Sequence, residues 1–167
     1  VLYYYVLAPG YLLGHGSPVV AAYWMAFINS LTVFVVFYLG YLLTKKVGFG
    51  ILAAFLFAVS FESTQYATWL SNPTLGVLTV PLMYLGLWIW ITKGKILGPV
   101  LVAVGLGFSV QSEIFLIYHL IPICIWLFIS RKAISKKSLI IFGTFFILSI
   151  STMILGEFKF GFRIIGG

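Results

Sequence analysis

Long apolar stretches alternate with short polar turns along most of the chain. The pattern predicts six membrane-spanning helices, because stretches of roughly 15 to 25 residues are long enough to cross a hydrocarbon layer of about 30 Å. Three of the stretches contain a proline, and at Pro81 we expect a helix kink that neighbouring helices accommodate. The predicted spans run approximately from Val20 to Leu43, Gly48 to Phe61, Thr74 to Thr92, Ile96 to Val110, Ile114 to Ile129 and Ser138 to Leu155.

The segment VLYYYVLAPGYLLGHGSP, which precedes the first span, predicts an interfacial or re-entrant lead-in. It is short, is interrupted by proline and glycine, and is rich in tyrosine, which favours headgroup depth. We also expect that residues 1–167 are one transmembrane domain, an internal fragment of a larger protein. The chain does not begin with methionine, and it stops at FRIIGG without a terminal feature.

Composition strengthens the membrane interpretation and removes other classes of protein. The chain is 62% hydrophobic and 8% charged, whereas soluble domains have about 25% charged residues. We therefore predict an all-α, polytopic membrane protein. The net charge of +7 comes from short basic clusters between apolar stretches, which fits membrane topology better than nucleic-acid binding. A single cysteine, Cys124, supports neither a disulfide framework nor a zinc site.

Acidic and basic residues are distributed unevenly between alternate turns of the chain. The turns after the first, third and fifth spans contain eight of the ten Lys and Arg residues and no acid. The other turns contain all three acids, Glu62, Glu113 and Glu157, together with Lys159 and Arg163. The positive-inside rule places the basic turns in the cytoplasm. The polar candidates are then expected at the extracytoplasmic face of a plasma or inner membrane.

Two of the acids are candidates for a site. Glu62 belongs to the polar stretch FESTQYATWLSNPTLG, where it is either a solvated helix-end carboxylate or a substrate-binding group. Glu113 follows Gln111 in a turn with almost no loop, so we expect both at or below the headgroup level. Acids at membrane depth are functional candidates, and a structural role for Glu113 stays open.

Other polar residues carry weaker signals. Lys159 and Arg163 are positioned to hold a lipid phosphate, or else they snorkel to the interface. His119 follows Glu113 by six residues, about 600° of α-helix rotation, so we expect the two on different faces and His119 as a packed polar residue. No cofactor motif is evident, the need for a divalent metal stays open, and the chain has no Asp for a Ser-His-Asp triad. Gly105 and Gly107 favour close helix packing.

Several stretches resemble the GT-C class of membrane glycosyltransferases, within it the protein mannosyltransferase and aminoarabinose transferase group. The stretch VLYYYVLAPGYLLGHGSPVVAAYWMAFINSL is similar to the segment that follows the first outer loop in these proteins. GFGILAAFLFAVSFESTQYA, WLSNPTLGVLTVPLMYLGLWIW, GFSVQSEIFLIYHLIPI and GEFKFGF resemble later parts. The resemblance implies transfer of a sugar from a polyprenyl-phosphate donor in the membrane to a protein or glycolipid acceptor.

The resemblance also implies roles for particular residues. The family's principal acids lie in the first outer loop, which would precede Val1, and its second acidic position matches Asn72. Asn72 cannot act as a base, so the catalytic base is left unassigned, although Asn72 can bind a sugar hydroxyl. Trp69 is either a stacking surface for a sugar or an interfacial anchor. Arg163 and Lys159 are the donor-phosphate candidates, and Glu113 and Glu62 are candidates for substrate binding.

Two other functions fit part of the pattern. A transporter or lipid flippase would also be helical and basic on its cytoplasmic side, but it usually places polar groups near the bilayer midplane. The acids gather in turns on one side, which favours an enzyme at the outer face. Gln111 and Glu113 would favour transport if they lay deep in the membrane. A non-catalytic assembly subunit also stays open.

Overall fold

The computed structural model describes residues 2–131 and 134–160, and within them it contains helices and no strands, with 87% of these residues helical. This confirms the all-α prediction. In chain order the elements, with η marking a short 3₁₀ helix, are α1 (Leu2–Leu13), α2 (Pro18–Ser30), α3 (Thr32–Thr44), α4 (Val47–Ala58), α5 (Phe61–Ala67), η1 (Asn72–Leu75), α6 (Gly76–Lys93), α7 (Leu97–Ser112), η2 (Ile114–His119), α8 (Leu120–Ile129) and α9 (Lys136–Phe160).

Three helical segments are long and apolar enough to cross a membrane: Pro18–Thr44, Asn72–Lys93 and Lys136–Lys159. The count rises to four if α4 and α5, which meet at a bend of 59°, form one broken span. This is fewer than the six spans predicted, because α7 and the η2–α8 segment are short apolar helices. Many large apolar side chains on the outside of the bundle are exposed, which fits a lipid surrounding.

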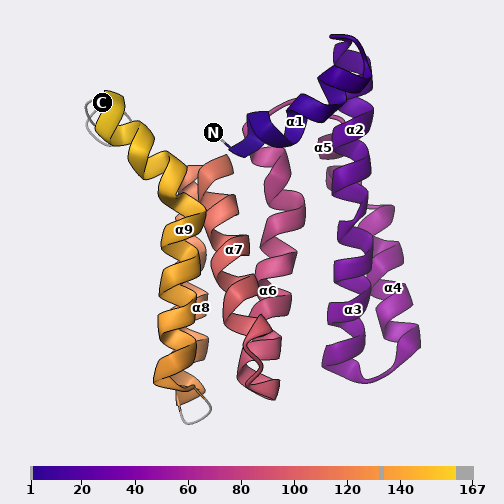
Figure 1. Cartoon of the computed structure of the whole chain (residues 1–167). Coiled ribbons are helices and arrows are strands. Elements are labelled where there is room, and N and C mark those ends of the chain that lie inside the picture. Colours follow the sequence, from indigo (N-terminus) through magenta and orange to yellow (C-terminus); the bar gives the residue numbers. More distant parts are fainter. Residues whose placement is uncertain (1, 132–133, 161–167) are drawn as a thin grey trace.

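The packed centre of the molecule is the contact between α6 and α7, with α9 against the other side of α7 (Figure 1). Small residues let these backbones approach. A Cβ at Gly98 would lie 2.5 Å from Trp90 Cα, and one at Gly105 would lie 2.8 Å from Met83 Cβ. One at Gly107 would lie 2.5 Å from a Cβ on α9. The prediction that Gly105 and Gly107 serve helix packing is therefore confirmed.

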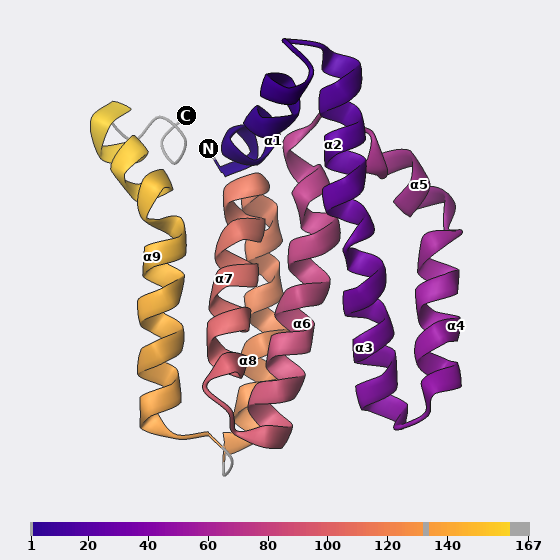
Figure 2. The same cartoon turned by 45° about the vertical axis from the view of Figure 1, so that its right-hand side comes forward.

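The N-terminal helix α1 lies across one end of the bundle instead of running along it (Figures 1 and 2). Its Tyr3 and Leu7 are buried against α2. The Trp24 indole N–H of α2 donates a 2.8 Å hydrogen bond to the Val6 carbonyl. Helix α1 thus closes the end of the bundle near the start of α6.

The two ends of the bundle differ in charge. The α3–α4 connection, the α6–α7 connection and the facing ends of α8 and α9 lie together at the end opposite α1 (Figure 2). They contain seven of the eight described Lys and Arg residues, and the exception is Lys159 in the last turn of α9. Glu62 lies in α5, Glu113 follows α7 and Glu157 lies near the end of α9. Within the described residues, all three acids therefore belong to elements at the α1 end.

Candidate functional site

The junction between α7 and η2 places Glu113. Helix α7 ends at Ser112, and Glu113 takes an extended backbone conformation, with φ −148° and ψ 114°. Its N–H still donates to the Ser109 carbonyl at 2.8 Å, and its own carbonyl accepts from the Leu116 N–H at 3.0 Å. Because both backbone groups are engaged by the adjoining helices, Glu113 is held at a fixed corner between them.

The following segment is a 3₁₀ helix and not the first turn of an α-helix. A 3₁₀ helix has three residues per turn, so residues three and six apart lie on one face. Glu113, Leu116 and His119 accordingly line the same pocket. The expectation that Glu113 and His119 lie on different faces of one α-helix is wrong, because no α-helix runs through both residues: Glu113 is extended, and the 3₁₀ helix begins only after it.

Glu62 reaches the same pocket from the bend between α4 and α5. The Ser60 side chain caps α5 by accepting a 3.2 Å hydrogen bond from the Ser63 N–H. Glu62 lies in the first turn of α5, where a carboxylate is favoured by the exposed N–H groups. The bend of 59° turns this polar helix away from the direction of α4, and the carboxylate of Glu62 remains exposed to solvent.

These elements border an open cleft of about 410 Å³, here named the carboxylate pocket. It contains two acids and a histidine, and its lining has no Lys or Arg, so it suits a ligand that offers hydroxyl or other donor groups. Its size is within the range of small-molecule sites. The lining residues are Phe57, Glu62, Ser63, Tyr66, Pro73, Gly76, Val77, Val80, Pro81, Glu113, Leu116, Tyr118 and His119.

His119 is buried at the base of this pocket, with 7% of its surface exposed. Its Nδ1 forms a 2.9 Å hydrogen bond with the Tyr84 hydroxyl of α6, and its ring lies 4.2 Å from the Tyr118 ring. The bond to Tyr84 fixes the orientation of the imidazole. His119 is thus a packed polar residue, as expected, and it is also part of the pocket wall.

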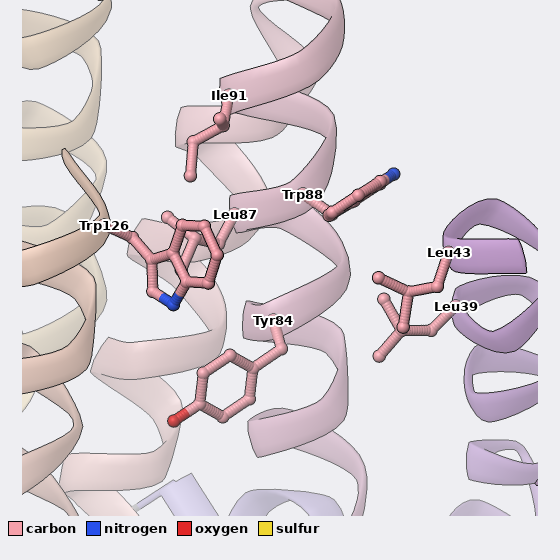
Figure 3. Close-up of a pocket in the computed structure, with 7 residues that line it drawn as sticks. All are labelled: Leu39, Leu43, Tyr84, Leu87, Trp88, Ile91 and Trp126. Atoms are coloured by element: carbon pink, nitrogen blue, oxygen red, sulfur yellow. The ribbon is translucent and has the colours of Figure 1, made fainter. Parts of the chain in front are cut away.

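Tyr84 connects the carboxylate pocket to a second, apolar pocket. Residues 84, 87, 88 and 91 follow the i, i+3, i+4, i+7 spacing of one helix face. Figure 3 shows that two leucines of α3 point toward this face from one side and that Trp126 of α8 lies over it from the other. The cavity has about 280 Å³ and is here named the apolar pocket; its lining is Leu39, Leu43, Tyr84, Leu87, Trp88, Ile91 and Trp126.

Two other predicted residues lie beside the carboxylate pocket and not in its wall. Asn72 is exposed and begins η1, whereas its neighbour Pro73 lines the pocket. Trp69 is 53% exposed. Its ring lies 5.1 Å from the ring of Tyr66, which belongs to the pocket wall. Trp69 therefore reaches the pocket only through Tyr66.

The predicted phosphate-binding residues are not brought to this pocket by the described structure. Lys159 is exposed in the last turn of α9 and is not among the lining residues. Arg163 lies outside the described residues. Glu157 is buried, and its Oε2 has no hydrogen-bond partner within residues 2–131 and 134–160. The described part of α9 thus contributes no lining residue to the carboxylate pocket.

Gln111, two residues from Glu113, has a different role. Its side-chain amide N–H donates to the Ser149 carbonyl of α9, and its Oε1 accepts a 3.0 Å hydrogen bond from the Thr152 hydroxyl. Both ends of the amide are engaged in joining α7 to α9. This is the arrangement of a structural tie between α7 and α9.

Sequence reasoning missed the Tyr84–His119 pair. Nothing in the sequence marks the end of α7 at Ser112, and this break is what brings Glu113 and His119 to one pocket. Tyr84 carries no signal of its own in a stretch rich in aromatic residues. In the described part of the chain, no group of three His, Cys, Asp or Glu side chains is arranged to hold a metal ion.

Comparison with known proteins found no matching family model, no matching curated protein and no matching solved structure. The arrangement of side chains is therefore the basis for assigning a function.

Proposed function

We propose that this protein is a glycosyltransferase that moves a sugar from a polyprenyl-phosphate donor to an acceptor at the extracytoplasmic face of the membrane. One observation carries the proposal: Tyr84, which lines the apolar pocket, forms a hydrogen bond with the buried His119, which lines the pocket with the two carboxylates. A lipid-linked sugar has the same two parts. The resemblance to the GT-C class supports the same conclusion.

The carboxylate pocket suits the sugar and the acceptor. Carboxylate oxygens accept hydrogen bonds from hydroxyl groups, and Glu62 and Glu113 supply them from two different elements. Aromatic side chains of Tyr66 and Tyr118 add flat apolar surface to the same wall. Asn72 and Trp69, just outside the wall, are proposed to contact the acceptor at the mouth of the pocket.

The apolar pocket suits the first units of the isoprenoid chain. Its walls are aliphatic and aromatic side chains from α3, α6 and α8, and Tyr84 places its hydroxyl at the boundary with the polar region. Burying apolar surface contributes about 25 cal/mol for each Å² removed from contact with water. A donor lying across this boundary would have its chain in the apolar pocket and its sugar near Glu113.

In the proposed reaction, Glu113 accepts the proton of an acceptor hydroxyl. The acceptor oxygen forms a bond to the anomeric carbon of the sugar, and the bond from that carbon to the phosphate oxygen breaks. The electron pair leaves with the polyprenyl phosphate. Glu113 is preferred to Glu62 because it is half-buried and held at a fixed backbone corner, whereas Glu62 is exposed. Lys159 and Arg163 are proposed to bind the phosphate.

The proposed topology has six membrane crossings, with the short helices α7 and η2–α8 included. The basic end of the bundle is placed in the cytoplasm by the positive-inside rule. The carboxylate pocket, at the α1 end, then opens to the extracytoplasmic side of a plasma or inner membrane.

A reconstituted system tests the proposal. The protein is placed in proteoliposomes with polyprenyl-phosphate donors that carry labelled mannose, glucose or aminoarabinose, and membrane extract supplies acceptors. We expect label to leave the donor lipid and appear in a larger product for one of the sugars. If the label stays on the donor while the donor crosses the bilayer, the protein is a flippase and the proposal fails.

A further inference from the structure

His119 has one ring nitrogen without a partner. The side chain is buried in the wall of the carboxylate pocket, and its Nδ1 is engaged with the Tyr84 hydroxyl at 2.9 Å. Its Nε2 has no hydrogen-bond partner within the described residues. Unlike the unpartnered indole nitrogens of Trp88 and Trp90, this nitrogen is not sealed from solvent. A polar atom that a buried ring presents to a pocket is expected to bond to the molecule that fills the pocket.

Tyr84 determines which ring nitrogen carries the proton. Its hydroxyl proton has no other acceptor among the described residues, so the hydroxyl donates and Nδ1 of His119 accepts. In a neutral imidazole, one nitrogen accepts and the other carries the proton. The Nε2–H group is therefore a donor, and it calls for an acceptor oxygen in the ligand.

The imidazole lies at the boundary between the two pockets. The Tyr84 ring lines the apolar pocket, and its centroid is 5.6 Å from that of the His119 ring. Figure 3 shows the Tyr84 hydroxyl directed away from the leucines of α3. In a lipid-linked sugar, the phosphate lies between the chain and the sugar. A donor with its chain in the apolar pocket and its sugar beside the carboxylates therefore has its phosphate next to His119.

The carboxylate pocket offers a phosphate few other partners. Ionised Glu62 and Glu113 are acceptors only, and they repel an anion. His119 is the one side chain in this wall that contains a nitrogen. The wall also contains hydroxyl groups, but those of Tyr66 and Tyr118 belong to exposed side chains. The Nε2–H group is thus the buried, oriented donor that a phosphate at this boundary would meet.

We propose that His119 donates a hydrogen bond from Nε2–H to the phosphate of the lipid-linked donor, at the oxygen that joins phosphorus to the anomeric carbon. When the bond from that carbon breaks, the electron pair stays on this oxygen, and the hydrogen bond stabilises the developing negative charge. No proton has to leave the imidazole. His119 is then a catalytic residue and Tyr84 a positioning residue. The inference deepens the proposed function, on which it rests for the identity of the ligand.

The chain offers a direct readout, because it contains two histidines, His15 and His119. The whole chain is labelled with ¹⁵N at histidine in detergent micelles, and the imidazole nitrogens are followed by NMR, which distinguishes a proton-bearing nitrogen from a bare one. The exposed His15 is the internal control. Its φ is 47°, so His15→Asn assigns the signals with a residue that tolerates this backbone conformation.

The probes are farnesyl phosphate, farnesol, which has the same chain without the phosphate, and inorganic phosphate, which has no chain. We expect Nε2 of His119 to carry the proton before any addition. Farnesyl phosphate should shift this signal saturably, at a concentration at least about tenfold lower than either other probe, because hydrogen bonds to charged groups are the stronger ones. The His15 signal should follow only the general charge of the micelle.

Three outcomes would overturn the inference. A bare Nε2 in the free protein would remove the donor. Saturation by farnesol at the same concentration would show that the site reads only the chain, and saturation by inorganic phosphate at the same concentration would show a site for free phosphate. The positioning role of Tyr84 is tested by Tyr84→Phe, which should give a mixture of the two imidazole tautomers. An unchanged tautomer would refute that role.

The same measurement separates this inference from the proposed function, because it needs no sugar transfer. We expect Glu113→Gln to keep the shift of the His119 signal with farnesyl phosphate. A phosphate-dependent shift in a protein that transfers no sugar would support the phosphate site and refute the transferase. Sugar transfer by a protein whose His119 signal ignores farnesyl phosphate would support the transferase and refute the role of His119.

Discussion

The two faces of α6 are built in opposite ways. On the face toward α7, glycines bring the backbones together, and Met83 and Trp90 are buried in one cluster. On the face toward α4 and α5, Val77, Val80 and Pro81 border the carboxylate pocket. The first face stabilises the fold and has little room for a ligand. The second face borders an open pocket that contains the polar side chains Glu62, Glu113 and His119 of neighbouring elements. The contrast indicates that this second face carries the function.

The largest effect is expected from removing the Glu113 carboxylate on the open face. Glu113→Gln keeps the shape of the side chain but removes the proton acceptor, so the rate of sugar transfer should fall about 10²- to 10⁴-fold. Transfer kinetics in proteoliposomes would measure the loss. Glu62→Gln is the matched control at the exposed rim, with a smaller expected loss. A Glu113→Gln protein with normal transfer would show that Glu113 is structural.

The packed face is tested by Gly98→Ala. The new Cβ would lie 2.5 Å from Trp90 Cα and Trp90 N, so the helices must separate, at a cost of about 1–3 kcal/mol. Thermal unfolding in detergent would show a lower midpoint. Gly143→Ala in α9 is the control, because its Cβ meets nothing within 4 Å and alanine favours a helix by up to about 1 kcal/mol. Equal midpoints for the two variants would contradict the tight packing.

The link between the two pockets is tested by Tyr84→Phe. The substitution removes the hydroxyl that bonds to His119 Nδ1, and a hydrogen bond of this kind contributes about 0.5–1.5 kcal/mol. We expect transfer to slow by up to about tenfold as the imidazole loses its fixed orientation. Tyr23→Phe, at an exposed position of α2, should leave the rate unchanged. A similar rate for both variants would remove His119 orientation from the mechanism.

A smaller effect is expected in the apolar pocket from Trp126→Ala. The shortened side chain leaves less surface for an isoprenoid chain, so the KM for long-chain donors should rise by a few-fold, with kcat unchanged. Donors with a very short chain should be affected much less. Phe128→Ala, at an exposed position of the same helix, is the control. A KM that is insensitive to chain length would exclude this pocket as the lipid subsite.

The smallest effect concerns charge at the two ends of the bundle. Arg163→Ala is expected to weaken donor binding by a few-fold, more than Lys93→Ala at the basic end, because only the former removes a proposed phosphate ligand. Equilibrium binding of a labelled polyprenyl-phosphate donor would compare them. Equal affinities for the two variants would remove Arg163 from the phosphate site.

The sequence predicted the helical class, the separation of charges and the packing role of Gly105 and Gly107, because each depends on local composition or on residues close in sequence. The sequence predicted more helices of membrane-spanning length than the structure contains, since apolar stretches such as α7 are shorter than a bilayer requires. It treated Glu113 and His119 as parts of one α-helix, because the sequence carries no signal for the extended residue Glu113 between α7 and η2.

The bend after α4 has a consequence for the surrounding lipid. Helix α4 has 12 residues, about 18 Å at 1.5 Å per residue, whereas the hydrocarbon core is about 30 Å thick. The polar helix α5 turns aside before that distance is covered. In a bilayer of ordinary thickness, the hydrocarbon layer beside α4 must become thinner, or water must enter it as far as Glu62. A water-soluble acceptor would then meet a lipid-embedded donor below the general level of the membrane surface.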